Sequence, residues 1–454
     1  MKQRLHNIYR PLDERKKDFK EVERNLSDAE VAEQSSRCTE CGIPFCHGSG
    51  CPLENVIPEM NAAVLAGNYR EAWNILSMTS NFPEFTARIC PALCEGSCTA
   101  GIDGNPVMVR QLEKVIVEKA FELNYITPFM PEKMSGKNVV VVGSGPAGLA
   151  VADELMRQGH TVTVFEKNAA PGGLLRYGIP DFKLEKWVIN RRINLMKESG
   201  IKFECNTQIG IDVAIEYLYK RFDAVVIAIG TPEARDIAVP GRELSNIHFA
   251  LDFLGGQNRV NAGELKTPPI SVTGKKVVVI GGGDTGSDCV GTSLRQDAKS
   301  VLQLEIMPEP PQIRSSSTPW PEWPYQLRTS SSQLEGGKRR WNIQTKTFKG
   351  KNGKVEALET VQVKWEFTPT GIPLKFKEIA GTEETIPADM IFLALGFTGV
   401  STPDALGLDI GERGTLKAED GIFVVGDCAK GASLVVRAIA HSREIAKEIN
   451  KYLS

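Results

Sequence analysis

Residues 138–150 read NVVVVGSGPAGLA, and this stretch decides the fold. Its first five residues form a largely apolar run that predicts a buried strand, after which a helix is expected to begin. The turn between them is Gly143-Ser144-Gly145-Pro146-Ala147-Gly148. In a dinucleotide-binding unit, the first glycine makes the tight turn, the second lets the backbone approach a pyrophosphate, and the third allows close packing of helix on strand. The N-terminus of the helix then faces the phosphates.

The residues that follow complete this unit. Thr161 to Phe165 predicts a second strand, and Glu166 ends it. An acid at that place, about 20 residues after the first glycine, can accept hydrogen bonds from both ribose hydroxyls. A GxGxxG motif alone is a weak signal, whereas strand, turn, helix, strand and acid together predict a Rossmann-like domain.

The same pattern recurs once. Lys276 to Ile280 predicts a strand, Glu305 ends the next one, and the turn between them is Gly281-Gly282-Gly283-Asp284-Thr285-Gly286. Two complete fingerprints indicate two bound dinucleotides. The usual reason for holding two is hydride transfer between a nicotinamide and a flavin.

The choice of nicotinamide depends on Glu305. A carboxylate there suits the free 2′-hydroxyl of NADH and repels the 2′-phosphate of NADPH, which favours NADH. Arg314, in the segment that follows, is a candidate to fold back onto a phosphate. The competing interpretation is that Glu305 is a surface acid at the end of a strand and binds no cofactor. The sequence therefore leaves the NADH/NADPH preference open.

A third motif lies near the C-terminus. Residues 421–427 (GIFVVGD) predict a strand that ends in Gly426 and Asp427, with a helix beginning near Ala432. An Asp in that position can bind the ribityl or phosphate part of a flavin nucleotide. A plain turn with an N-cap Asp explains the same residues, and both interpretations stay open.

Seven of the ten cysteines lie between Cys38 and Cys98. A reduced intracellular chain with clustered cysteines favours metal over disulfides. Their spacing, with a Pro after one of them, is typical of iron–sulfur ligand runs. Structural zinc is the main competitor, but a four-cysteine zinc site leaves three cysteines without a role. The cysteines are Cys38, Cys41, Cys46, Cys51, Cys90, Cys94 and Cys98.

Two four-iron clusters need one ligand more than these cysteines supply. Glu113 is the best candidate, because it lies among apolar residues of a predicted helix, and a buried unpaired carboxylate is costly unless something binds it. A salt bridge from Glu113 to Arg88 or Arg110 is the competing explanation. His47, beside Cys46, is the other possible ligand.

The chain is long enough for about three domains. Residues 1–135 are expected to be helical, with helices opening at Ser27, Asn68 and Asn105-Pro106, and residues 308–341 are expected to form a long loop. Cys289 and Cys428 are expected to be small core residues.

The overall composition excludes several classes of protein. A net charge of −2 gives no reason to expect nucleic acid or an anionic membrane as a partner. The sequence has neither an apolar run of membrane-spanning length nor the apolar core of a signal peptide, so we expect a cytoplasmic protein.

Together these motifs resemble a known family, the small (beta) subunit of NAD(P)H-dependent glutamate synthase, over essentially the whole chain. The wider group includes the N-terminal half of dihydropyrimidine dehydrogenase and the large subunit of electron-bifurcating ferredoxin:NADP oxidoreductase. The matching stretches are CTECGIPFCHGSGCPLENVIPE, ICPALCEGSC, VVVVGSGPAGLA, FEKNAAPGGLLRYGIPDFKL, VVVIGGGDTGSDC, LEIMPEPP, PWPEWP and VGDCAKGASLVVRAI.

The resemblance implies an α/β protein of glutathione-reductase-like type: a helical iron–sulfur domain followed by two Rossmann-like domains. It implies an iron–sulfur domain over 1–135, an FAD domain over 136–238 and 398–454, and an NAD(P)H domain over 239–397. It implies one [4Fe-4S] cluster on Cys38, Cys41, Cys46 and Cys98, and a second on Cys51, Cys90, Cys94 and Glu113. FAD should contact residues 143–148, Glu166, Leu174, Arg176, Lys183, Gly426 and Asp427, and NAD(P)H should contact Gly282, Gly283, Asp284, Thr285, Gly286, Glu305 and Arg314.

The function implied by the resemblance is electron input. NAD(P)H reduces FAD, and electrons leave through the clusters to a large subunit with FMN and a further cluster, where glutamine and 2-oxoglutarate become glutamate. No catalytic acid or base is expected, since hydride transfer to a flavin needs none. The alternative is a related oxidoreductase subunit that serves ferredoxin, sulfide or pyrimidine chemistry. The residues 440–443 (AHSR) depart from relatives that have Gly before the Arg.

Overall fold

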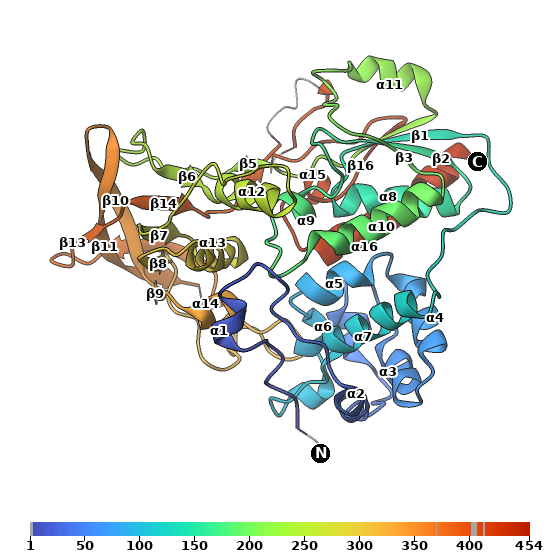
Figure 1. The fold of residues 1–454 in the computed structure, drawn as a ribbon, viewed down its shortest axis with the longest axis horizontal. Helices are drawn as coiled ribbons and strands as arrows, with labels where there is room; N and C mark the ends of the chain where they lie inside the picture. Colours follow the sequence, from blue (N-terminus) through green and yellow to red (C-terminus); the bar gives the residue numbers. More distant parts are fainter. Residues whose placement is uncertain (1–2, 369, 401–405, 412–413) are drawn as a thin grey trace.

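The computed structural model describes residues 3–368, 370–400, 406–411 and 414–454. Figure 1 shows the N-terminal helices lying below one parallel sheet, with a second parallel sheet beside them. In the part of the chain that is described, none of the helices combines the length and apolarity needed to cross a bilayer.

The N-terminal region is helical, as the sequence predicts. Ser27 and Glu30 form the predicted capping box, and Asn68 caps the next predicted helix through the backbone N–H of Glu71. The elements are α1 (Leu12–Arg15), α2 (Asp28–Ser35), the π-helix η1 (Cys46–Gly50), α3 (Ile57–Leu65), α4 (Tyr69–Thr79), α5 (Pro83–Ile89), α6 (Leu93–Gly96), the 3₁₀ turn η2 (Thr99–Gly101) and α7 (Val109–Glu122).

The predicted start of α7 at Asn105-Pro106 is wrong. The helix begins at Val109, because the carbonyl oxygens of Asn105 and Pro106 accept hydrogen bonds from the Arg37 side chain, at 2.6 and 2.8 Å, and so do not enter the helix. Sequence rules for helix starts use only neighbouring residues, so they do not include a side chain that lies 68 or 69 residues earlier in the chain.

The first sheet holds five parallel strands. Their spatial order is β16 (Ile422–Val424), β4 (Ala224–Ile227), β1 (Asn138–Val142), β2 (Thr161–Phe165) and β3 (Lys202–Glu204). The helices of this domain are α8 (Pro146–Arg157), α9 (Leu174–Tyr177), α10 (Lys186–Glu198), α11 (Ile215–Arg221), α15 (Asp427–Lys430) and α16 (Val435–Leu453). Every residue of β1 after Asn138 is buried, as expected for a parallel strand covered on both faces.

The second sheet is also parallel. Its order is β6 (Ile247–Phe249), β14 (Met390–Leu393), β7 (Lys276–Ile280), β8 (Ser300–Leu304) and β9 (Lys338–Arg340). Its helices are α12 (Ala250–Asn261), α13 (Asp284–Arg295) and α14 (Ser331–Glu335). The expectation of a loop through 308–341 is therefore wrong for its last part, where α14 has a capping box at Ser330 and β9 adds the edge strand.

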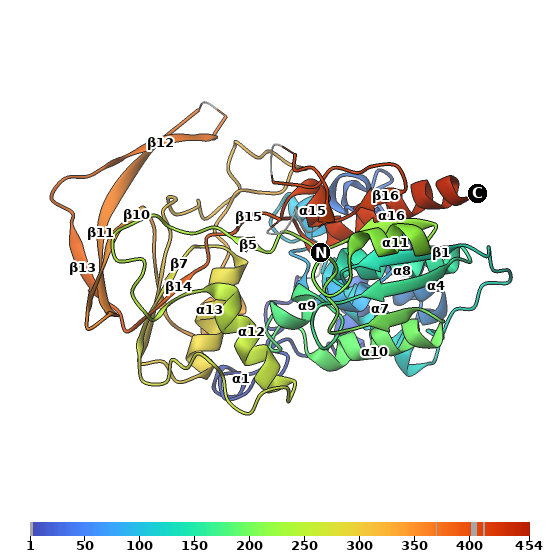
Figure 2. The same ribbon diagram turned by 90° about the horizontal axis from the view of Figure 1, so that it is seen from above.

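A long antiparallel excursion follows β9. It contains β10 (Ile343–Lys351), β11 (Lys354–Phe367), β12 (Pro373–Glu378) and β13 (Glu384–Pro387), and Figure 2 shows it projecting from the second sheet. Where the chain passes between the two parallel sheets, β5 (Glu233–Ala234) pairs with β15 (Phe397–Gly399) in a short antiparallel ribbon.

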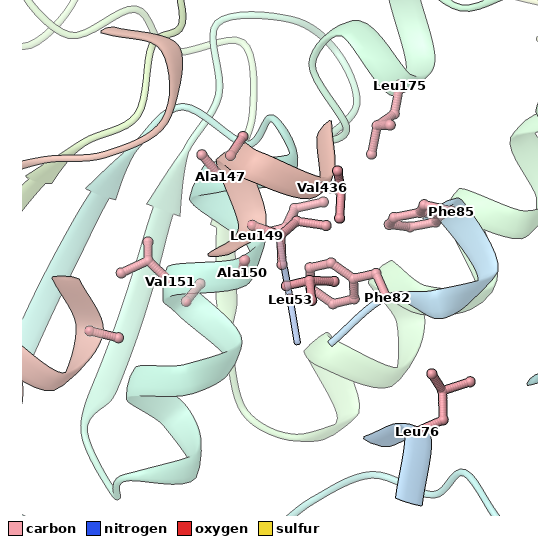
Figure 3. Close-up of a cluster of buried hydrophobic side chains, with 14 of the residues drawn as sticks. Leu53, Leu76, Phe82, Phe85, Ala147, Leu149, Ala150, Val151, Leu175 and Val436 are labelled. Atoms are coloured by element: carbon pink, nitrogen blue, oxygen red, sulfur yellow. The ribbon is translucent and has the colours of Figure 1, made fainter. Parts of the chain in front are cut away.

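The helical region shares its core with the first sheet. Figure 3 shows Leu53 and Phe82 packed near Leu149 and Val436, which come from α8 and α16. Leu53, Phe82 and Leu149 are all buried. Apolar burial of this kind stabilises by about 25 cal/mol per Å² and makes the N-terminal helices part of one body with the first sheet.

An N-terminal arm (residues 3–26) ties the helical region to the second sheet. The backbone N–H of Val22 donates to the carbonyl of Phe182 at 2.9 Å. Nearer the N-terminus, Arg15 of the arm forms an ion pair with Glu335 of α14 at 3.0 Å. Arg295 of α13 pairs with the same carboxylate at 2.6 Å. The Glu335 side chain is fully buried between them.

Candidate functional site

The first fingerprint turn has the shape that a dinucleotide requires. A Cβ at Gly143 would lie 2.5 Å from the Ala228 carbonyl oxygen, and one at Gly148 would lie 2.0 Å from that of Gly143, so both positions are closed by packing. Gly145, in contrast, has nothing within 4 Å of where a Cβ would stand. The free space is therefore at the second glycine, the one that approaches a pyrophosphate.

Glu166 lies against this turn. One carboxylate oxygen accepts from the Ser144 N–H at 3.2 Å and from the Ser144 hydroxyl, and the other accepts from the Asn168 N–H at 2.8 Å. The side chain is buried. These donors fix the carboxylate at the end of β2, where it can receive a ribose.

The C-terminal motif meets the same turn from across the sheet. Gly426 has φ +70°, and a Cβ there would lie 2.5 Å from that of Ala147. Its N–H donates to Nδ1 of His441 at 3.2 Å, and the Asp427 carboxylate accepts from the Ser433 hydroxyl at 2.9 Å. Burial raises the pKa of Asp427 and lowers that of His441. The structure thus brings residues 143–148 and 426–427 together.

The three residues predicted to bind FAD in the segment GGLLRYGIPDFKL lie in different surroundings. Leu174 is exposed beside the fingerprint turn, because Gly173 packs its backbone against Gly145. Arg176 is buried, and its guanidinium donates to the Pro171 carbonyl and to Asn190, both at 2.6 Å. Lys183 forms an ion pair with Asp288, next to the second fingerprint.

The second fingerprint repeats the arrangement of the first. Cβ atoms at Gly281 and Gly286 would lie 2.2 and 2.3 Å from carbonyl oxygens, whereas Gly283 has nothing within 4 Å. Asp284 and Thr285 begin α13. Glu305 ends β8, and its carboxylate accepts from the N–H groups of Gly282 at 2.6 Å and Met307 at 2.9 Å.

Within the described residues, Arg314 does not contact the second fingerprint; it binds to backbone carbonyls elsewhere. Its guanidinium donates to the carbonyls of Gly96 at 2.7 Å and Glu322 at 2.6 Å, which joins the segment after β8 to the helical region. The same segment places the Trp320 ring 4.6 Å from the Phe45 ring, and the Ser97 hydroxyl donates to the Pro321 carbonyl at 2.7 Å.

The cysteines surround two separate cavities. The first, which we call the inner cavity, is lined by Cys51, Cys90, Cys94 and Glu113, and also by Val436 of α16. The second, which we call the outer cavity, is lined by Cys38, Cys41, Cys46 and Cys98. These are the two groups of four that the family resemblance implies.

Glu113 faces the inner cavity without either of the salt bridges considered above. Asn55 Nδ2 donates to its carboxylate at 2.8 Å, while Arg88 pairs with Glu21 and Glu118, and Arg110 pairs with Glu23. Burial raises the pKa of Glu113 to about 7. His47, the other candidate, has its Nδ1 3.0 Å from the Asn55 carbonyl oxygen.

The thiols suit a cluster better than a single ion. Burial raises the pKa of Cys46 and of Cys51 to about 12, and that of Cys90 to about 11. No three His, Cys, Asp or Glu side chains of the described residues converge as ligands of one ion. Zinc needs such convergence, whereas a cluster takes its thiolates from around its periphery.

Sequence reasoning missed three polar residues at these sites. Asn55 and Asn61 line the inner and outer cavities, and His441 binds the Gly426 turn. The signal for Asn61 is a buried amide inside the apolar helix IPEMNAAVL, where Asn is an unfavourable residue. Burial raises the pKa of Cys38, and the nearby Asn61 amide acts in the opposite direction. Cys289 and Cys428 are fully buried core residues, as predicted.

Comparison with known proteins agrees with this geometry. A family model described as dihydropyrimidine dehydrogenase domain II, 4Fe-4S cluster, matches residues 15–125, and one described as pyridine nucleotide-disulphide oxidoreductase matches residues 137–442. The glutamate synthase [NADPH] small chain of Mycobacterium tuberculosis is 46% identical over 98% of this chain and 93% of its own length. That of Bacillus subtilis is 41% identical over 97% and 94%.

The chain belongs to the glutamate synthase small-chain family. It is a flavin- and pyridine-nucleotide-dependent oxidoreductase with an iron–sulfur domain. The glutamate synthase [NADH] of Schizosaccharomyces pombe is 42% identical over 99% of this chain but only 22% of its own length, so the small-chain sequence is there part of a longer polypeptide.

A solved structure matches the fold of a large part of this small-chain protein. FprA of Mycobacterium tuberculosis in complex with NADPH superposes with a TM-score of 0.55 and 20% identity, over 70% of this chain and 84% of that one. At this identity the likeness shows the fold alone.

Proposed function

We propose that this chain is the electron-input subunit of a glutamate synthase and acts in the cytoplasm. The groups it would hold supply the chemistry: FAD accepts hydride from NAD(P)H, and two [4Fe-4S] clusters carry single electrons to a large subunit that makes glutamate from glutamine and 2-oxoglutarate. The chain's own residues bind these groups, set their order and exclude water.

One observation carries the proposal. Val436 lines the inner cavity and lies on α16, the helix whose His441 holds the flavin-binding turn at Gly426. Val436 also belongs to the same buried cluster as Leu53 and Phe85 of the N-terminal region, and Figure 3 shows it beside Phe85 and Leu149. The inner cavity therefore adjoins the proposed FAD site, which supports a path that runs from the flavin to the inner cluster and then to the outer cluster.

The outer end of this path reaches the surface. Cys41 of the outer cavity is exposed, and the neighbouring Ile43 is 72% exposed. An exposed apolar residue beside a cluster ligand suits a surface covered by a partner subunit. We infer that electrons leave there, toward a large subunit with FMN and a further cluster.

We also propose that NADH is the preferred reductant. The Glu305 carboxylate is held at Gly282 by two backbone donors, where it can accept a ribose 2′-hydroxyl and would repel a 2′-phosphate. Arg314 is bound to Gly96 and Glu322. The names of the relatives contain both NADPH and NADH, so they do not decide between the two.

Anaerobic titration of the purified chain with NADH and with NADPH, followed optically, tests the whole proposal. We expect one flavin and about eight irons per chain, four for each cluster. NADH should bleach the flavin at lower concentration than NADPH. A chain that contains zinc instead of iron, or no flavin, would contradict the proposed function.

The identity of the partner needs a second experiment. Copurification of the chain with its native partner should recover a large glutamate synthase subunit, and the chain alone should reduce artificial acceptors without forming glutamate. Recovery of a ferredoxin-, sulfide- or pyrimidine-linked partner would instead favour the related oxidoreductases, and glutamate formation by the chain alone would contradict the division of labour.

A further inference from the structure

Asn61 lies in the wall of the outer cavity. It is on α3, one helical turn after Ile57, and Ile57 and Pro58 line the same cavity. The Asn61 side chain is completely buried. Among the residues that the structure describes, neither its Nδ2 nor its Oδ1 forms a hydrogen bond of normal geometry, and the polar group on which its amide acts is the Cys38 thiol of the same cavity.

The corresponding asparagine of the inner cavity is different. Asn55 Nδ2 donates to Glu113 at 2.8 Å, and its Oδ1 accepts from the Thr79 hydroxyl at 2.8 Å. The protein thus gives one cavity asparagine two well-formed hydrogen bonds and leaves the other with only the Cys38 thiol nearby. A buried amide without partners is costly, and Asn is also a poor residue inside a helix. Asn61 therefore needs a partner that occupies the cavity.

The other groups around Asn61 indicate the kind of partner. The cavity is lined by four cysteines, and its remaining wall is largely apolar. A group held by these thiolates would present sulfur atoms with negative charge to the amide. Sulfur of this kind accepts hydrogen bonds, so the NH₂ of the amide is the matching end.

We propose that Asn61 Nδ2 donates a hydrogen bond to a sulfur of the iron–sulfur cluster held by Cys38, Cys41, Cys46 and Cys98, and so raises that cluster's reduction potential. This inference rests on the proposed function. Reduction adds one negative charge to the cluster, and a donor stabilises the more negative form. One electron leaves the inner cluster, which is oxidised, and enters the outer one, which is reduced. No bond forms and no proton moves.

The consequence is a direction for electron flow. The inner cavity contains a carboxylate, Glu113, whose negative charge disfavours further reduction there. The outer cavity contains an unpaired donor in place of a carboxylate. The two side chains act in the same sense, because one makes the inner cluster the weaker acceptor and the other makes the outer cluster the stronger one.

The test is an anaerobic redox titration of the full chain, followed by electron paramagnetic resonance. Asn61→Leu keeps the volume of the side chain and removes the donor. We expect the outer cluster's affinity for its electron to fall about tenfold, which is about 59 mV for a one-electron couple. The inner cluster's potential should not move, and Met60→Leu, a buried apolar exchange on the same helix, should leave both potentials unchanged.

A second measurement needs no variant. In the reduced wild-type chain, electron–nuclear double resonance should detect a proton at the outer cluster that exchanges in D₂O, and Asn61→Leu should lose it. If Asn61→Leu fails to assemble, the wild-type spectrum decides: absence of an exchangeable proton overturns the inference. An ordered water as the true partner would appear as an unchanged potential in Asn61→Leu, which also overturns it.

Iron analysis separates this inference from the proposed function. A wild-type chain without iron overturns both. A chain with full iron content whose outer potential ignores Asn61→Leu overturns the inference alone.

Discussion

Asn55 Nδ2 donates a hydrogen bond of 2.8 Å to the carboxylate of Glu113, a residue that faces three cysteines across the inner cavity. This contact holds a buried acid at the cavity wall, where it would be the fourth ligand of the proposed inner cluster. We predict that Glu113→Ala loses about half of the iron, the share of one of two equal clusters, and keeps its FAD. Glu113→Cys should restore the iron. Full iron content and an unchanged inner-cluster spectrum in Glu113→Ala would show that Glu113 is not a ligand.

Glu305 should set the choice between the two nicotinamide cofactors. Glu305→Gln removes the negative charge that repels a 2′-phosphate, so we expect the ratio of kcat/KM for NADH to that for NADPH to fall about tenfold, equivalent to about 1.4 kcal/mol. Steady-state reduction of an artificial acceptor measures this ratio. Arg314→Ala is the matched control and should leave it unchanged, because Arg314 is bound to Gly96. A changed ratio in the control would mean that Arg314 reaches the nucleotide.

FAD binding at the Gly426 turn, as proposed above, should become weaker in acid. Nδ1 of His441 accepts from the Gly426 N–H and must be neutral to do so, and burial lowers the pKa of His441 below its ordinary 6.5. A lowered pKa in the folded state means that its stabilising contribution is complete above pH 6.5 and is lost as the pH falls through the lowered value. Among the charged groups that act on His441, Lys430 also lowers its pKa, whereas Glu444 and Glu448 raise it.

We therefore expect FAD affinity, measured by fluorescence, to decrease below pH 6.5 in the wild type. His441→Leu should bind FAD about fivefold more weakly at pH 7.5, because the loss of one hydrogen bond costs about 1 kcal/mol. The FAD affinity of this variant should not decrease further below pH 6.5. An identical acid profile in His441→Leu would assign the effect to another group.

The Trp320 ring should protect the outer cavity. It packs 4.6 Å from Phe45, the residue before Cys46. We predict that Trp320→Ala exposes this loop to solvent, so the purified chain loses outer-cluster iron severalfold faster in air, while its FAD and inner cluster remain. Trp341→Ala, whose ring packs on Arg339, is the control and should lose iron at the wild-type rate.

The arm contact at Glu335 should matter for stability. Glu335→Ala leaves Arg15 and Arg295 buried without their partner, and breaking a buried pair in this way costs about 3–5 kcal/mol. Chemical denaturation followed by fluorescence measures the free energy of unfolding. Glu378→Ala removes an ion pair with Lys346 that is half-exposed, and should cost less than about 1 kcal/mol. An equal decrease in the free energy of unfolding in the two variants would show that the buried ion pairs of the arm stabilise the protein no more than an exposed pair does.

Local sequence patterns were sufficient for much of the fold. The strand before Gly143, the turn after it and the capping box at Ser27 depend on residues close together in the chain, and the structure confirms each. The second fingerprint at Gly281 follows the same rules. Such features need no knowledge of the rest of the molecule.

Other features depend on distant partners. The start of α7 depends on Arg37, and the course of the segment after Glu305 depends on Gly96 and Phe45, more than 200 residues earlier. The grouping of the cysteines came from the family resemblance, because spacing alone does not say that Cys98 faces Cys38 across one cavity. Asn61 was missed because a lone asparagine in a helix carries no motif.

The β5–β15 ribbon makes the second sheet an insertion whose two ends meet. Glu233 lies opposite Gly399 in that ribbon, so roughly the length of one ordinary domain leaves and re-enters at a single place. If this insertion binds NAD(P)H as proposed, it could be exchanged as a unit, and the choice of electron donor with it, without interrupting the first sheet. An exchanged segment would have to re-form two contacts with the N-terminal region: the ion pair of Arg15 with Glu335 and the ring contact of Phe45 with Trp320.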